Sequence, residues 1–210
     1  MEKLKALFAH KIVKIIKWAF FVLLAAYFVL VIFRVFHFFD VEKTEEQVAK
    51  IHATKLQLSD VMGDNLPPDP GAEADKTVAG IDANDNGIRD DVELAIFREY
   101  SDSAKTRAVL LQYALALQMQ MTLEVVNTET VVATVEDLDS RANICLWSLS
   151  SRDDLERFLE DIEKYGNFVE NLQLNTEQRK KYLDDLYEDN LGSYSSSNEG
   201  CDLDLSVLPN

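Results

Sequence analysis

The sequence predicts an all-α protein in which one N-terminal transmembrane helix is followed by a helical-bundle domain. Three observations favour this class: a long apolar run near the N-terminus, apolar residues at helical spacing through most of the remaining chain, and only 7 Gly and 4 Pro among 210 residues. Hydrophobic residues make up 47 % of the chain. That is enough for one globular core beside an anchor, but not for two sizeable domains.

Residues 18–39 form the predicted membrane anchor. From Trp18 to Phe33 they carry no polar side chain except one tyrosine, and a bilayer core needs about 20 such residues in a helix. Arg34 follows near the end of the span, where its side chain can reach the headgroups. Bulky aromatic residues come next, which disfavours a cleaved signal peptide with its small residues at the cleavage site. The other alternative is a buried core helix, which the basic residues before the span disfavour.

Charge is divided unevenly between the anchor region and the body of the protein. Residues 1–39 carry six basic side chains and one acidic one, so the remaining chain carries a net charge of −21. Such a body is repelled by phosphates, which excludes nucleic acid and favours a basic protein or a cation as partner. Five lysines precede the span, so we expect residues 1–17 in the cytoplasm and the body outside, as for a bacterial inner-membrane protein with a periplasmic domain.

The only two cysteines are Cys145 and Cys201. They form no CxxC pair and have no histidine at a spacing suited to zinc. If the body is extracytoplasmic, one disulfide that ties the tail to the domain is the simplest pairing. The alternative is two separate buried thiols, which would fit a cytosolic body.

The body divides into four segments by composition. Residues 40–62 are predicted to be an amphipathic stalk helix, and residues 63–79 are a Pro-rich linker. Residues 80–191 form the predicted helical domain, and residues 192–210 are a Ser-rich tail pinned at its cysteine.

Several helices are expected within the helical domain. Residues 91–123 predict two helices with a break at 101–103, and the second is apolar on most faces, as for a helix in the middle of a bundle. Further helices are predicted over 136–149 and over 152–173, and a last helix is predicted to follow and to end at Tyr187. Ser151 is the expected N-cap of the 152–173 helix, and Asn175 or Thr176 that of the last helix. Apolar residues follow at helical spacing in the 152–173 segment, namely Leu155, Phe158, Leu159, Ile162, Tyr165, Phe168, Val169 and Leu172.

One short stretch, residues 82–93, carries recognisable chemistry. Oxygen-bearing side chains stand at positions 1, 3, 5, 9 and 12 of this window, with Gly87 at position 6; they are Asp82, Asn84, Asn86, Asp90 and Glu93. Alternating oxygen ligands in a tight loop can converge on one calcium ion, which takes six to eight of them. The stretch resembles the calcium loops of EF-hand-like and thrombospondin type 3-like proteins. The resemblance implies that Ile88 adds its carbonyl and that the last glutamate is bidentate.

The resemblance covers only this dozen residues. Ile88 stands at the backbone-ligand position and Arg89 at the next position, where EF-hands usually place a hydrophobic residue. No helix is predicted directly before the loop, so the stretch resembles a loop-helix half of the motif. The alternative is an Asn/Asp/Gly turn that caps the following helix. Because two ligand positions are asparagines, the expected affinity is weak, on the order of 10⁻⁴ M.

No catalytic set is visible: the chain has no HExxH, no GxSxG and no Gly-rich phosphate loop. We therefore expect no enzymatic activity. The sequence predicts a membrane-anchored, extracytoplasmic calcium-binding protein that serves as a binding or scaffold module. The alternative is an immunity-type protein that neutralises a periplasm-acting toxin, since an acidic surface suits rapid capture of a basic partner.

Overall fold

The computed structural model describes residues 2–189 and 199–209. Every regular element in this part of the chain is helical and none is a strand, so the predicted all-α class is confirmed. The chain forms two compact units, residues 1–45 and 46–210, which are described separately below. The first part of the predicted tail, residues 192–198, lies outside the described residues.

The first unit is part of the long helix α1 (Glu2–Ala53). Between Lys14 and Ala53 this helix is long and apolar enough to cross a membrane, with a mean hydropathy of 2.6 in its most apolar window. None of that window is buried in protein, whereas the core helix of a globular protein would be mostly covered. A single candidate membrane-spanning helix is therefore present among the residues described.

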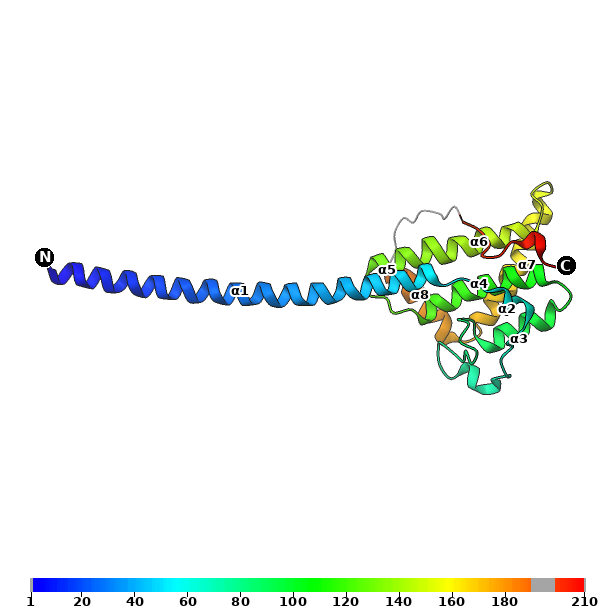
Figure 1. Cartoon of the computed structure of the whole chain (residues 1–210), viewed down its shortest axis with the longest axis horizontal. Helices are drawn as coiled ribbons and strands as arrows, with labels where there is room; N and C mark the ends of the chain where they lie inside the picture. The colour runs from blue at the N-terminus through cyan, green and yellow to red at the C-terminus, as the bar shows by residue number, and fades with distance from the viewer. Residues whose placement is uncertain (1, 190–198, 210) are drawn as a thin grey trace. The chain divides into compact units, whose positions relative to one another are not determined.

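The second unit is built from short and medium helices (Figure 1). Its α-helices are α2 (Leu58–Met62), α3 (Asp90–Glu99), α4 (Ala104–Thr122), α5 (Thr128–Ala133), α6 (Ser140–Leu146), α7 (Leu155–Gln173) and α8 (Glu177–Asp189). The shorter helical turns are η1 (Gly71–Asp75), the π-helical η2 (Thr134–Asp139), η3 (Trp147–Leu149) and η4 (Leu205–Val207).

Several helix ends lie where the sequence predicts them, and others lie at different residues. The break between α3 and α4 falls where predicted, and Ser103 caps α4 by accepting a hydrogen bond from the Thr106 amide at 3.1 Å. Of the two residues expected to cap α8, Asn175 and Thr176, the structure shows Thr176 as the cap. The predicted stalk helix is interrupted after Ala53, because α1 ends there and α2 begins only at Leu58.

The helix predicted over 136–149 begins earlier, at Thr128. Asn127 caps it, and α5, η2 and α6 follow one another without a break to Leu146. The expected cap of the next helix was also wrong. Asp154 accepts from the Arg157 amide at 3.2 Å, so α7 begins at Leu155, whereas Ser151 accepts only from the Asp153 amide.

Helix α4 lies in the middle of the second unit, as its apolar faces predicted. Every residue from Arg107 to Met121 is buried. The helix contacts α2, α3, α6, α7, α8 and η2, and Figure 1 shows it running through the domain beside these elements. The core therefore surrounds one helix on all sides.

Buried glutamines connect the core helices to the segments packed around them. Gln118 of α4 donates to the carbonyl of Ala79 at 2.6 Å, before the predicted calcium loop. Gln173 of α7 donates to the carbonyl of Ala114 at 3.0 Å. Because a buried N–H donor without a partner costs about 1–3 kcal/mol, these two bonds favour the positions at which the loop and α7 meet α4.

A buried arginine orders the Pro-rich linker. Arg179 of α8 is fully buried, and its guanidinium donates to the carbonyls of Ala74, Thr77 and Val78. It also forms an ion pair with Asp75 at 2.7 Å. A guanidinium has five donors, so one side chain can satisfy a whole turn of exposed carbonyls. The linker is thus an ordered part of the domain.

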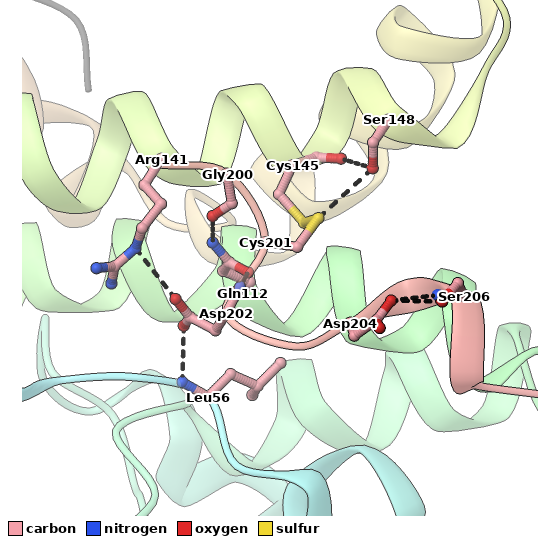
Figure 2. The surroundings of a disulfide bond; sticks show 10 residues. All are labelled: Leu56, Gln112, Arg141, Cys145, Ser148, Gly200, Cys201, Asp202, Asp204 and Ser206. Atoms are coloured by element: carbon pink, nitrogen blue, oxygen red, sulfur yellow. Dashed lines mark hydrogen bonds and ion pairs between the residues drawn. A yellow bond between two sulfur atoms is a disulfide. The ribbon is translucent and has the colours of Figure 1, made fainter. Parts of the chain in front are cut away.

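The C-terminal strap, residues 199–209, is fastened to α4 and α6 (Figure 2). Cys201 is bonded to Cys145 of α6, which confirms the predicted disulfide. The next residue, Asp202, has a side chain that is 1 % exposed, accepts a hydrogen bond from the Leu56 amide at 2.8 Å and lies 3.1 Å from Arg141 Nε. Gln112 binds the strap on both sides of the disulfide, at the Gly200 carbonyl and the Asp202 amide.

The disulfide is expected to stabilise the domain strongly, because it closes a sequence separation of 56 residues. The chain-entropy model gives about 4 kcal/mol for a loop of this length. Cys201→Ala should lower the free energy of unfolding of the full chain in detergent by that order, measured by denaturant titration. Cys145→Ala with Cys201→Ala should cost little more than the single change. A purified protein whose gel mobility and unfolding midpoint do not respond to reductant would contradict the bond.

Candidate calcium loop

The loop at residues 82–93 is closed by hydrogen bonds between its own residues. Asp82 accepts from the backbone amides of Asn86 and Gly87 at 3.1 and 2.9 Å. Asn86 accepts from the Ile88 amide at 2.8 Å, and Asp90 accepts from the Ala83 amide at 2.9 Å. The side chains at template positions 1, 5 and 9 therefore all turn inward in this tight loop.

Backbone geometry explains why the sixth position is glycine. Gly87 has a φ of 84°, in the left-handed region that residues with a Cβ rarely adopt. A Cβ there would also lie 2.8 Å from Leu115 Cδ1 in α4. Asp85 has a φ of 56°, which Asp and Asn tolerate better than other residues. Two left-handed residues produce the sharp bend, and the glycine brings the loop close to α4.

Two neighbouring residues anchor the end of the loop in the core. Ile88, whose carbonyl is a predicted ligand, has a fully buried side chain in the hydrophobic core. Arg89 is also fully buried, forms an ion pair with Asp91 at 2.6 Å and donates to the carbonyls of Leu172 and Gln173. The departure from the EF-hand pattern at Arg89 thus has a structural cause: this side chain satisfies the C-terminal end of α7.

The inner side of the loop holds polar atoms that are buried without partners. Asp90 is fully buried and Glu93 is 1 % exposed, and both lie in the first turn of α3. Asn84 donates to a carboxylate oxygen of Glu93 at 3.1 Å. Asn84 Oδ1 and Asp90 Oδ2 are buried oxygens with no hydrogen-bond partner. Unpaired buried acceptors are costly, and a cation is the kind of group that would satisfy several of them together.

Burial also changes the acidity of these carboxyl groups. Burial, opposed by the side-chain amides of Asn84 and Asn86 and aided by the charges of Asp60 and Asp90, raises the pKa of Glu93 to about 7. Burial likewise raises the pKa of Asp82 and of Asp90. Each of these groups would be easier to ionise beside a positive charge.

The carboxylates of the loop are not grouped into a metal site in this structure. Within residues 2–189 and 199–209, no three His, Cys, Asp or Glu side chains are grouped so that they could hold a metal ion. Asp82 uses both oxygens on backbone amides, and Asp90 uses one. The donor types fit calcium, because carboxylate, amide and carbonyl oxygens are its preferred ligands. Calcium binding would require these side chains to move towards one another.

An open cleft of about 570 Å³ gives access to the loop. Asp82, Asn84 and Asn86 line it, together with Gln118 of α4 and Lys50 of α1 among other residues. Asp90 and Glu93 do not line the cleft. An ion could therefore reach the first three ligand positions from solvent, with the last two lying deeper.

Two residues near the loop could not be identified from the sequence. Asn65 accepts from Asn84 Nδ2 at 2.9 Å through its carbonyl, and Asp60 contributes to the raised pKa of Glu93. Both belong to the α2 region, far from the loop in sequence. No local pattern indicates such contacts, because they depend on how α2 packs on the core.

Comparison with known proteins gives no further identification. No family model matches the chain, and no curated protein or solved structure matches it. The candidate site therefore depends on its own residues.

The raised pKa of Glu93 predicts an unusual pH dependence in the absence of calcium. Between the ordinary value of 4.5 and about 7, the folded protein keeps a proton that the unfolded chain has lost. Stability is therefore lost as pH rises through this window. The free energy of unfolding should be measured in chelator for the wild type and for Glu93→Gln. Between pH 4.5 and pH 8 that of the wild type should fall by about 3 kcal/mol more than that of the variant.

Glu99→Gln is the control, since Glu99 is exposed on the same helix. That variant should follow the wild-type pH profile. If Glu93→Gln also follows it, the Glu93 carboxyl is not protonated in the folded protein at neutral pH.

Proposed function

We propose that this protein is a membrane-anchored, extracytoplasmic calcium-binding protein whose helical domain serves as a binding or scaffold module. The observation that carries the calcium assignment is the pair of buried, unpartnered oxygens, Asn84 Oδ1 and Asp90 Oδ2, beside the buried carboxyl group of Glu93. A turn that only capped α3 would not need a buried glutamate on its inner side.

In this proposal calcium is structural. The loop follows the ordered linker and ends in the first turn of α3, and it approaches α4 where Gly87 lies beside Leu115. A cation that replaces the proton on Glu93 would remove the cost of burying that carboxylate and hold the N-terminal end of α3 against the core. Ile88 would add its carbonyl oxygen to the side-chain ligands.

The compartment is proposed from two features. The Cys145–Cys201 disulfide suits an oxidising environment, and the five lysines before the span favour a cytoplasmic N-terminus. A bacterial inner membrane with the domain in the periplasm fits both. The net charge of −21 beyond residue 39 supports a basic protein partner.

The proposed orientation predicts the behaviour of fusion proteins. A reporter that is active only outside the cytoplasm, fused after Asn210, should be active in cells. A reporter that is active only in the cytoplasm should be silent at the same site, and the reverse should hold for fusions before residue 1. Activity of the cytoplasmic reporter after Asn210 would place the domain in the cytoplasm. That result would contradict the proposed orientation and the oxidising compartment proposed for the disulfide.

Calcium should raise the melting temperature of the full chain in detergent, measured by circular dichroism against a chelator. At tenfold above the dissociation constant, linkage gives about 1.4 kcal/mol, or roughly 3–6 °C for a domain of this size. Magnesium should help much less, because it demands a near-octahedral site. Glu93→Gln should remove the calcium effect and, in chelator at pH 8, melt no lower than the wild type, because the neutral amide avoids burying a charge.

Asp85→Asn is the matched control for the calcium experiment. Residue 85 stands at a non-ligand position, is exposed, and its left-handed backbone tolerates asparagine. Asp91 is unsuitable, because it pairs with the buried Arg89. A melt that calcium does not move, or an Asp85→Asn variant that loses the effect as fully as Glu93→Gln, would show that the loop is only a turn.

A further inference from the structure

The first half of α7 carries an apolar strip that is uncovered in the described structure. Leu155 is 64 % exposed and Leu159 is 56 % exposed, and the two residues lie one helical turn apart. The same strip continues into Ile162, which is partly buried against the core, and Val169, which is fully buried in it. The sequence pattern is therefore that of one continuous packing face, of which only the second half is covered.

Three glutamates form one border of this strip. At 100° per residue, Glu156, Glu160 and Glu163 lie side by side along the edge next to Leu159. All three are exposed. No ion pair with any of them occurs among the described side chains. The strip is thus apolar in the middle, with three carboxylates that form no ion pair on one edge; Arg157 and Lys164 of the same helix lie beyond them.

The opposite border faces the rest of the domain. Phe158 is almost completely buried there, and the guanidinium of Arg152 lies 5.6 Å from its ring centre and 6.0 Å from that of Trp147. This border is already packed, so the charge of Arg152 is held on the far side of the strip from the glutamates. Only the acidic edge remains free to meet a partner.

We propose that the strip of Leu155 and Leu159, with its border of Glu156, Glu160 and Glu163, is the docking site for an amphipathic helix of a partner protein. That helix would carry lysine or arginine along one edge. The apolar face supplies the buried contact and the glutamates supply the selectivity for a basic helix. This inference rests on the proposed role as a binding module, and it does not depend on calcium.

Charge favours this occupant over two others. A second copy of the chain would bring three more carboxylates to the edge next to the leucines, and like charges that face each other there oppose the contact. An anionic lipid surface would be repelled by the same edge. A basic helix neutralises the edge while it covers the leucines.

The test uses two synthetic helical peptides and the full chain in a neutral detergent. Both peptides have three heptads with leucine at positions a and d; one has lysine at e and g and the other has glutamate there. Binding is measured by fluorescence anisotropy of the labelled peptide in chelator, with empty micelles as the blank. The lysine peptide should bind, and its affinity should fall as salt is raised from about 0.05 to 0.5 M. The glutamate peptide should not bind.

Variants then assign the site. Leu155→Ser with Leu159→Ser should weaken the lysine peptide at least about tenfold, because two buried leucine contacts are lost. The matched control is Leu58→Ser with Met62→Ser, one turn apart on α2 and similarly exposed at 52 % and 46 %; its affinity should stay within about twofold of the wild type.

A second pair of variants tests the charged edge. Glu156→Gln with Glu160→Gln should weaken binding and flatten its salt dependence. Asp184→Asn with Glu188→Gln, exposed at the same spacing on α8, should do neither.

The proposal is overturned if the leucine variant on α7 binds as tightly as the wild type, or if the α2 control loses affinity equally. Equal binding of the glutamate peptide would also overturn it. So would a dimer of the full chain in sedimentation that disappears in the Leu155→Ser, Leu159→Ser variant, since the strip would then bind a second copy. Because the titration is made in chelator, its failure leaves the calcium assignment untouched, and a failed calcium melt leaves the peptide result untouched.

Discussion

The complete burial of α4 is the constraint on which the rest of the second unit depends. A helix that is covered on all sides can keep polar side chains only where another segment satisfies them. Gln112 both donates to and accepts from the C-terminal strap, and the amide NH2 group of Gln118 donates to the segment before the loop at residues 82–93. The positions of two non-helical segments are thus fixed by amides on one helix. The hydrophobic residues of α4 make the core, and its glutamines decide what surrounds it.

Buried arginines perform the same task for helix ends. Arg89, directly before α3, donates to the last carbonyls of α7, and Arg179 in α8 donates to the carbonyls between η1 and the loop. Each guanidinium therefore joins two segments that are distant in sequence. Arg179 therefore holds the segment just before the loop at residues 82–93, and Arg89 holds the loop from within.

Features set by local patterns could be predicted from the sequence. The all-α class, the central place of α4, the break before Ser103 and the cap at Thr176 all follow from periodicity and capping chemistry. The disulfide was the simplest pairing of the only two cysteines for an extracytoplasmic body, with two separate buried thiols as the alternative. The spacing of the candidate ligands in the loop could also be recognised in the sequence. In the structure three of these side chains turn inward, but among the described residues the carboxylates are not grouped into a metal site.

Features that depend on tertiary contacts could not be predicted. The continuous helix from Thr128 to Leu146 includes a π-helical turn, and neither its start nor its irregular turn follows from apolar spacing. Sequence reasoning also treated Arg89 only as a departure from a template, because its partners lie at the end of α7. Apolar spacing gave the same pattern for Leu155 and for Val169, yet one is exposed and the other is buried, since periodicity identifies a packing face without showing where its cover ends.

The disulfide, the raised pKa of Glu93 and the weak expected affinity for calcium have one requirement in common. A Cys145–Cys201 bond persists where thiols are not kept reduced. A loop with two asparagine ligands and an affinity on the order of 10⁻⁴ M would bind calcium only where calcium is plentiful, as it is outside the cytoplasm. Without the ion, neutral pH would leave a carboxyl group of pKa about 7 partly ionised in the interior, at a cost to stability. The proposed orientation in the membrane would therefore place the same domain where its covalent bond is retained and its buried carboxylate is neutralised.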